Sequence, residues 1–206
     1  MGSVFPSQHL GEILIAHEQD FEPLTAVRNT VVQASLGELR FAGYYERYAA
    51  NVDPDVLAEL LSNLAPSWVP IDLVDAHYRA CDAMSLNAGE LQRLGEAVGV
   101  RVRQTSIVVG SKPSDEPVDV WSIVAQLHRA WKRVYLGGSV QIVKLGPKDE
   151  LIELRGHSLY RYPYFRFGSL AAITAAHEAA GARIQSNRIV RYDALTHEIV
   201  LHLTWA

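Results

Sequence analysis

The 206-residue chain is 49% hydrophobic and 20% charged, a composition that fits one globular domain with a substantial core. Its single cysteine, Cys81, excludes an internal disulfide and any cysteine-rich metal cluster. The pI of about 6.0 argues against nucleic-acid binding, which needs a clearly basic face. No apolar run is long enough to cross a bilayer.

Charge is distributed unevenly along the chain. Residues 1–119 contain 8 Lys and Arg against 17 Asp and Glu, whereas residues 120–206 contain 11 against 6. Either the two halves face each other within one fold, or the basic half receives an anionic ligand or an acidic partner. The first residues lack the basic start and long apolar run of a secretory signal, so we expect a cytoplasmic protein.

The first part of the chain is predicted to be helical. Apolar residues at positions 36–48 recur near helical spacing. Asp53 and Pro54 then provide the N-cap and the first residue of a second helix, which ends before Pro66. A third helix is expected at 71–85, after an extended link.

Two further helices follow. Asn87 and Glu90 have the spacing of a capping box, which predicts a helix start. The strongest helical pattern begins at Pro117, because apolar and aromatic residues between Val120 and Tyr135 keep 3.6-residue spacing. Two glycines at 137 and 138 end this helix.

The periodicity changes to two after residue 137. Strands are predicted at 140–145 and 151–154, then a helix at 163–180, and last two strands at 183–192 and 198–205. The resulting order, helix-β-β-helix-β-β, predicts an α+β protein. Its helical N-terminal part is expected to pack on a four-stranded antiparallel sheet.

The segment Tyr160–Ser169 contains five aromatic residues and two arginines. One interpretation is a corner that leads into the last long helix, with Pro163 in its first turn. The alternative places Tyr162, Tyr164 and Arg166 around a pocket, where the guanidinium would hold a carboxylate or phosphate in bidentate geometry.

Several short motifs resemble those of a family of uncharacterised single-domain proteins found mainly in myxobacteria. The motifs are Trp68-Val69-Pro70, Glu90–Gly95, Leu154-Arg155-Gly156, the helix from Phe167 to Gly181, and a final strand that closes on Trp205. This resemblance implies an N-terminal extension at 1–29 and a single α+β domain at 30–206. The domain would be helical over 30–136 and sheet-containing over 137–206.

The C-terminal part also looks like two groups of ligand-binding domains, the vinyl-reductase type (V4R) and the haem–nitric-oxide-binding domains. Both place a small molecule between a helical part and an antiparallel sheet, so the resemblance implies a ligand there. The haem group holds its propionates with a Tyr-x-Ser-x-Arg motif, whereas Tyr162–Arg166 reads Tyr-x-Tyr-x-Arg. No histidine matches the axial ligand of that group. We therefore predict no cofactor and keep haem as an alternative.

The eight histidines show no metal-ligand spacing, so no metal site is predicted. No Gly-x-Ser-x-Gly motif marks a nucleophilic serine. His157 lies in a loop between a strand and a helix, where functional residues concentrate, and is a weak candidate for a general base.

These patterns favour a cytoplasmic small-molecule-binding or signalling module without catalytic activity. Its ligand would be small and apolar or acidic, in an aromatic-lined pocket formed by Trp131, Tyr162, Tyr164, Arg166 and His157. One alternative is an enzyme that acts on a hydrophobic small molecule with a His/Tyr acid–base pair. The other is a structural domain that forms homodimers through an exposed apolar patch. No nucleic-acid or membrane partner is expected.

Overall fold

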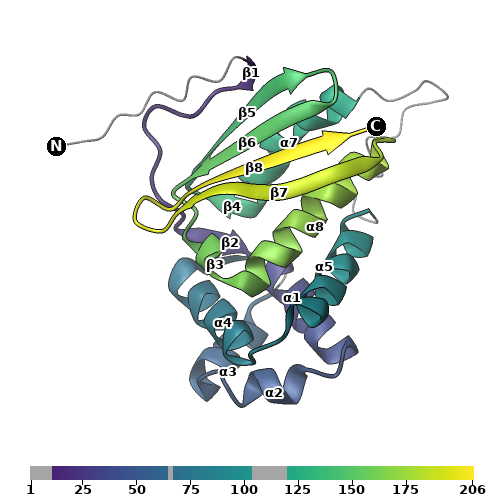
Figure 1. Ribbon diagram of the computed structural model, residues 1–206. Coiled ribbons are helices and arrows are strands. Elements are labelled where there is room, and N and C mark those ends of the chain that lie inside the picture. Colours follow the sequence, from purple (N-terminus) through teal and green to yellow (C-terminus); the bar gives the residue numbers. More distant parts are fainter. Residues whose placement is uncertain (1–10, 65–66, 104–119) are drawn as a thin grey trace.

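A helical part and an antiparallel sheet are joined by long helices that run beneath the sheet (Figure 1). The computed structural model describes residues 11–64, 67–103 and 120–206. Pro117, the predicted start of a helix, lies outside these residues. The predicted α+β class is confirmed, and so is the antiparallel sheet near the C-terminus.

Over residues 29–64 and 67–103, the helical part contains five helices in sequence. They are α1 (Asn29–Phe41), α2 (Tyr45–Ala49), α3 (Pro54–Ser62), α4 (Ile71–Ala83) and α5 (Ala88–Arg103). The helical pattern at 36–48 is divided between α1 and α2, because Gly43 adopts a φ of +77° that ends α1.

Local sequence signals account for two helix starts. Asp53 accepts a hydrogen bond from the backbone N–H of Asp55 at 2.8 Å, and Pro54 is the first residue of α3. Asn87 and Glu90 exchange side-chain-to-backbone hydrogen bonds at 2.8 and 3.0 Å, which is the predicted capping box of α5.

The main sheet has five strands in the order β1-β5-β6-β8-β7, all antiparallel. The four predicted strands are β5 (Ser139–Gly146), β6 (Asp149–Arg155), β7 (Ile184–Asp193) and β8 (Glu198–Trp205). The fifth, β1 (Glu12–Ile15), comes from the segment expected to be an extension and pairs with the edge of β5.

A second, three-stranded sheet lies at the junction of the helical part and the main sheet. Its order is β3-β2-β4, with β2 (Ala26–Arg28) between β3 (Trp68–Pro70) and β4 (Tyr135–Leu136). It therefore ties three distant parts of the chain together directly before α1, before α4 and after α7 (Val120–Val134).

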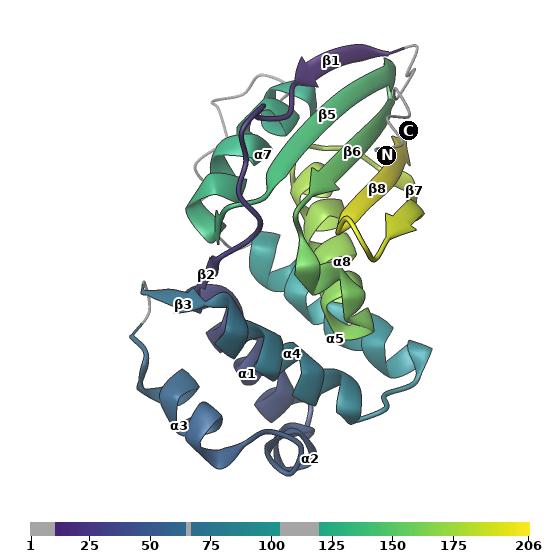
Figure 2. The same ribbon diagram turned by 90° about the vertical axis from the view of Figure 1, so that its left-hand side faces the viewer.

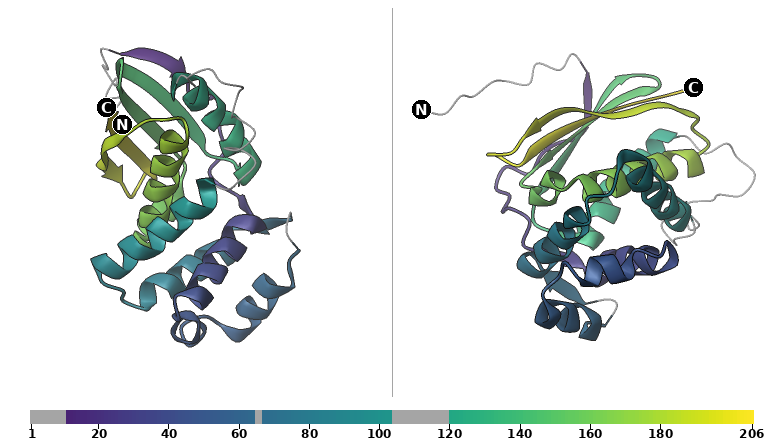
Figure 3. Two further views of the ribbon diagram at one scale, coloured as in Figure 1. Left: turned by 90° about the vertical axis from the view of Figure 1, so that its right-hand side faces the viewer. Right: turned by 60° about the horizontal axis from the view of Figure 1, so that its bottom comes forward.

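The helices α7 and α8 (Pro163–Ala179) lie against the same face of the main sheet (Figures 1 and 3). Trp205 on β8 contacts both: its ring centroid is 5.1 Å from Trp121 on α7 and 5.7 Å from His177 on α8. On its other side α8 packs closely on α5. Gly95 of α5 permits this approach, because a Cβ atom at that position would lie 2.9 Å from the carbonyl oxygen of Phe167.

A continuous core connects the helical part to the sheet. Tyr78 of α4 contacts Phe165 of α8 with ring centroids 5.0 Å apart, and Phe165 contacts Tyr160 of the short 3-10 helix η1 (Ser158–Arg161) at 5.1 Å. All three rings are buried. Aromatic side chains thus fill the space between the two parts.

Candidate functional site

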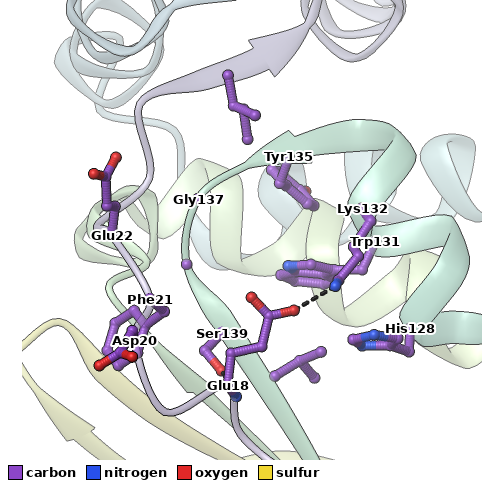
Figure 4. Close-up of a pocket in the computed structure, with 13 residues that line it drawn as sticks. Glu18, Asp20, Phe21, Glu22, His128, Trp131, Lys132, Tyr135, Gly137 and Ser139 are labelled. Atoms are coloured by element: carbon purple, nitrogen blue, oxygen red, sulfur yellow. Dashed lines mark hydrogen bonds and ion pairs between the residues drawn. The ribbon is translucent and has the colours of Figure 1, made fainter.

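A pocket of about 270 Å³ opens between the segment that precedes β2 and the end of α7. Figure 2 shows this segment, residues 16–25, passing from β1 along the end of β5 to β2. Residues 18 and 20–22 form one wall, and residues of α7, β4 and the start of β5 form the other (Figure 4). The volume lies just below the roughly 300–1,000 Å³ of sites for drug-sized ligands.

Backbone hydrogen bonds hold segment 16–25 against the rest of the domain. The N–H of Gly138 donates to the carbonyl of Glu22 at 2.7 Å, and the N–H of Leu24 donates to the carbonyl of Gly156 at 3.0 Å. Gly138 has a φ of +70°, and a Cβ atom there would lie 2.3 Å from Nε2 of His157. The two glycines predicted as a helix end therefore also let this segment and His157 approach closely.

An ion pair between Glu18 and Lys132 crosses the pocket (Figure 4). The hydrogen bond from Lys132 lowers the pKa of Glu18. Both side chains are about half exposed, so the pair lies at the mouth of the pocket. Exposed pairs of this kind contribute at most about 1 kcal/mol, so the pair can open without a large cost in stability.

His128 projects from α7 into the pocket, and its Nδ1 is buried without a hydrogen-bond partner among the described residues. Burial lowers the pKa of this imidazole, and Lys132 lowers it further. The ring is therefore neutral near pH 7. A buried polar atom without a partner is costly, which makes it a natural contact for a bound molecule.

Three polar side chains meet on the β5 side of the pocket. The Oγ of Ser139 lies 2.9 Å from Nδ1 of His17 and 3.0 Å from the backbone nitrogen of Glu18. Nε2 of His17 lies 3.7 Å from Oε2 of Glu153 on the neighbouring strand β6. The side chains of His17 and Glu153 are 9% and 2% exposed, so this cluster is screened from solvent.

The structure brings two of the five predicted ligand residues together. Trp131 lines the pocket, and its indole N–H donates to Nε2 of His157 at 3.2 Å. That hydrogen bond places the ring proton of a neutral His157 on Nδ1. Burial lowers the pKa of His157 to about 3, so this histidine is a weak base.

Tyr162, Tyr164 and Arg166 lie elsewhere, at the start of α8. Tyr164 is buried and its hydroxyl lies 3.1 Å from Oγ of Ser35, while Tyr162 stacks on Tyr78 at 6.4 Å. The guanidinium of Arg166 lies 5.8 Å from the ring of Tyr192. None of the three lines the pocket described above.

Among the residues that the structure describes, no group of three or more His, Cys, Asp and Glu side chains could hold a metal ion. Over the same residues, no helix combines the length and apolar character needed to span a bilayer.

Comparison with solved structures identifies the fold as H-NOX-like, the fold of haem–nitric-oxide-binding domains. A structure from a study of haem distortion in the H-NOX family matches with a TM-score of 0.58 and 12% identity over 86% of this chain and 94% of that one. An oxygen-binding H-NOX domain related to soluble guanylate cyclases matches with a TM-score of 0.57 and 11% identity over the same shares. A mutant H-NOX protein from K. algicida, in the Fe(II) unliganded state, matches with a TM-score of 0.57 and 7% identity over 87% of this chain and 96% of that one.

At these identities the likeness concerns the fold. No family model and no curated protein matches the sequence. The resemblances to the myxobacterial family and to the V4R domains therefore stay predictions.

The residues that the structure describes do not fit haem. The space between the helical part and the sheet, where the resemblance places a ligand, holds the rings of Tyr78, Tyr160 and Phe165. Two residues of the Tyr-x-Tyr-x-Arg sequence already have partners within the protein. The hydroxyl of Tyr164 is within hydrogen-bond distance of Oγ of Ser35, and the guanidinium of Arg166 lies beside the ring of Tyr192. The pocket of about 270 Å³ at the end of α7 is too small for a porphyrin.

His17, Ser139 and Glu153 were not among the site residues predicted from the sequence. His17 lies in the segment expected to be an extension, and Ser139 follows two glycines that were interpreted only as a helix end. Glu153 offered the one local signal, because it places a carboxylate in the middle of a predicted strand of apolar residues.

Proposed function

We propose that this chain is a haem-independent small-molecule-binding module whose ligand occupies the pocket between segment 16–25 and α7. The observation that supports it is the pairing of an indole wall, Trp131, with the unpartnered Nδ1 of His128 in one preformed pocket. Binding sites combine apolar surface with a few polar groups that fix orientation, and this pocket has both.

The ligand we infer is a single-ring or similarly small molecule that carries one hydrogen-bonding group. Its apolar part would stack on Trp131, and its polar group would pair with His128. An acidic group could also reach Lys132, which Glu18 neutralises in the absence of a ligand. This keeps the predicted apolar or acidic ligand but moves its anchor from Arg166 to Lys132 and His128.

Several solved relatives in fold are described as oxygen-binding or haem-containing, and we carry over only the general role of a small-molecule sensor. A sensing role suits the position of the pocket. Segment 16–25 connects β1 of the main sheet to β2 of the junction sheet, so a ligand there touches the link between the two parts. A cytoplasmic location and a homodimeric state stay predictions.

The test uses fluorine NMR of protein labelled with 5-fluorotryptophan, because each of the four tryptophans gives its own resonance. The Trp131→Phe variant assigns the resonance of the pocket wall. Phenol, benzoate and benzylamine are titrated separately, and haemin is added in a parallel absorption experiment. We expect at least one of the three rings to shift the Trp131 resonance, and we expect haemin to give no sharp Soret band.

Two variants locate the bound molecule. His128→Leu should weaken binding about fivefold, the equivalent of one net hydrogen bond of about 1 kcal/mol. Arg166→Ala is the matched control and should leave the affinity unchanged, because Arg166 does not line the pocket. The reverse pattern would place the ligand at Tyr162–Arg166, and an unmoved Trp131 resonance with all three rings would refute the proposal.

A further inference from the structure

The polar cluster of Ser139, His17 and Glu153 has the composition and order of an activated serine. A hydroxyl within hydrogen-bond distance of an imidazole, whose second nitrogen faces a carboxylate, recurs on unrelated folds as the device that makes serine a nucleophile. Here the two distances are 2.9 and 3.7 Å. Such triads are recognised by geometry and roles rather than by sequence position.

The N–H of Glu18 can only donate, so Ser139 Oγ accepts a hydrogen bond from it at 3.0 Å. Oγ keeps one proton and a second lone pair, so its 2.9 Å contact with Nδ1 of His17 forms with either tautomer of the neutral imidazole. In the tautomer with its proton on Nε2, on the side of Glu153, Nδ1 accepts the hydroxyl proton of Ser139, and a general base for serine requires this form.

The carboxylate is held in a fixed orientation. Glu153 lies on β6 directly opposite Gln141 of β5, and the Gln141 amide donates to its Oε2 at 3.4 Å. Its side chain is 2% exposed. Ser139 and Glu153 thus both stand on adjacent strands of the main sheet, which position them more precisely than a loop could.

The serine is also accessible to a bound molecule. Ser139 is 3% exposed, but that residue contributes to the lining of the pocket opposite His128 (Figure 4). A substrate in the pocket would therefore lie between the hydroxyl of Ser139 and the unpartnered Nδ1 of His128.

We propose that the pocket hydrolyses a small carboxylic ester, with Ser139 as the nucleophile, His17 as the general base and Glu153 as a positioning residue. The proposal rests on the pocket assigned above and adds a reaction to it. Ser139 Oγ forms a bond to the carbonyl carbon of the ester while its proton passes to Nδ1 of His17. The bond from that carbon to the alcohol oxygen breaks, and the alkoxide takes the proton from His17. Water then attacks the acyl-serine by the same route and releases the carboxylic acid.

The experiment treats the native full chain with diisopropyl fluorophosphate and follows the intact mass and the modified peptide. The phosphorus–fluorine bond breaks as the Ser139 oxygen–phosphorus bond forms, so one adduct per chain is expected, located on Ser139. Ser139→Ala should abolish the adduct. His17→Gln should slow its formation about 100-fold or more, which is the usual contribution of a general base.

Glu153→Gln separates a positioning role from a purely structural one. Loss of the carboxylate leaves the imidazolium that forms on His17 during the attack without its neighbouring negative charge, so the labelling rate should fall while the variant stays folded. Arg166→Ala lies outside the cluster and should label at the wild-type rate. If Ser139→Ala proves unstable, Ser139→Cys with iodoacetamide replaces it, and one alkylation at position 139 is expected.

The two proposals can fail separately. An unlabelled native protein, or an adduct on another residue, refutes the serine chemistry. If phenol, benzoate or benzylamine still shifts the Trp131 resonance in that case, the pocket is a binding site and the cluster serves only to hold segment 16–25. If no ring shifts the resonance and no adduct forms, both proposals fall.

Discussion

The interface between α8 and the main sheet contains an ion pair that is fully buried on both sides. Nε2 of His177 lies 2.7 Å from Oε1 of Glu150, and both side chains are 0% exposed. Oε2 of Glu150 has no hydrogen-bond partner among the described residues. Because the two groups differ in how easily they lose their charge, removing one partner should cost much more than removing the other.

The magnitudes follow from the cost of discharging the partner left behind. His177→Leu leaves a buried carboxylate, which escapes its charge by binding a proton. At pH 7 this costs an ordinary glutamate about 4 kcal/mol, since it titrates near 4.3 and each pH unit is worth about 1.4 kcal/mol. Glu150→Leu leaves an imidazole whose ordinary pKa of about 6.5 lies below pH 7, so losing its charge costs less than about 1 kcal/mol. The double variant removes both charges, so its free energy of unfolding should lie within about 1 kcal/mol of the wild-type value or exceed it.

Urea denaturation and thermal melts of the four proteins test this asymmetry. For a chain of this size, a loss of about 4 kcal/mol lowers Tm by roughly 8–16 °C. The deficit of His177→Leu should shrink as pH falls toward about 4, because the stranded carboxylate then protonates without cost. Equal losses for the two single variants, or a double variant as unstable as His177→Leu, would refute the reasoning.

The wild-type pair has its own pH dependence, with a sign set by His177. Burial alone would lower the pKa of this imidazole, but the hydrogen bond and charge of Glu150 outweigh it and raise the pKa above the ordinary 6.5. A raised pKa in the folded state means that the stabilisation is complete below about pH 6.5. It is lost as pH rises through the folded-state value.

Three further predictions concern the glycine, carboxylate and thiol that the structure constrains. Gly138→Ala should cost about 1–3 kcal/mol more than Gly181→Ala in urea denaturation. Both residues have positive φ, but only at 138 would a Cβ atom meet another side chain, His157; equal costs would contradict this clash. Asp75→Asn should cost about 1.5 kcal/mol at pH 7 by the same assay, because Arg79 and Arg161 both pair with the Asp75 carboxylate. Burial alone would raise the pKa of Asp75, but hydrogen bonds from Tyr162 and the two arginines outweigh it and lower the pKa. The difference should therefore decline below about pH 4 and vanish as pH falls through the lowered pKa of the folded state; a difference that stays unchanged there would exclude the charge. Cys81 is buried, and burial raises the pKa of its thiol. Ellman's reagent should therefore react with this thiol only after unfolding. Rapid reaction with the native protein would show instead that α4 opens.

Much of the fold was predictable because local signals agree with the tertiary structure. The capping residues Asp53 and Asn87 start the helices that the sequence indicates, and the alternation after residue 137 gives the four C-terminal strands. Strands β1, β2 and β4 were missed, and β3 was predicted only as an extended link, for one physical reason. They have two to four residues each, too few for a period of two to show, and they exist only through pairing with distant segments.

The site was less predictable for the same reason. Trp131 and His157 were singled out for their aromatic character and loop position, and the structure places them in contact, with Trp131 lining the pocket. His17 and Glu153 are far apart in the sequence, and no local pattern links them. They come into contact because segment 16–25 crosses the end of β5. The path of this segment is set by the pairing of β1 and β2 in the two sheets.

The buried rings of Tyr78, Tyr160 and Phe165 explain how a protein with an H-NOX-like fold can have a pocket away from the junction of its two parts. Protein interiors are packed nearly as densely as crystals, so a space between layers must be filled either by a ligand or by side chains. In this chain Tyr78, Tyr160 and Phe165 fill the space between the helical part and the sheet. The pocket at segment 16–25 lies at the edge of the junction, where polar groups gather. Function on a shared fold is decided by such sites rather than by the architecture, so the chemistry of this chain is to be tested at Ser139 and His128 and not at the position that the fold alone would suggest.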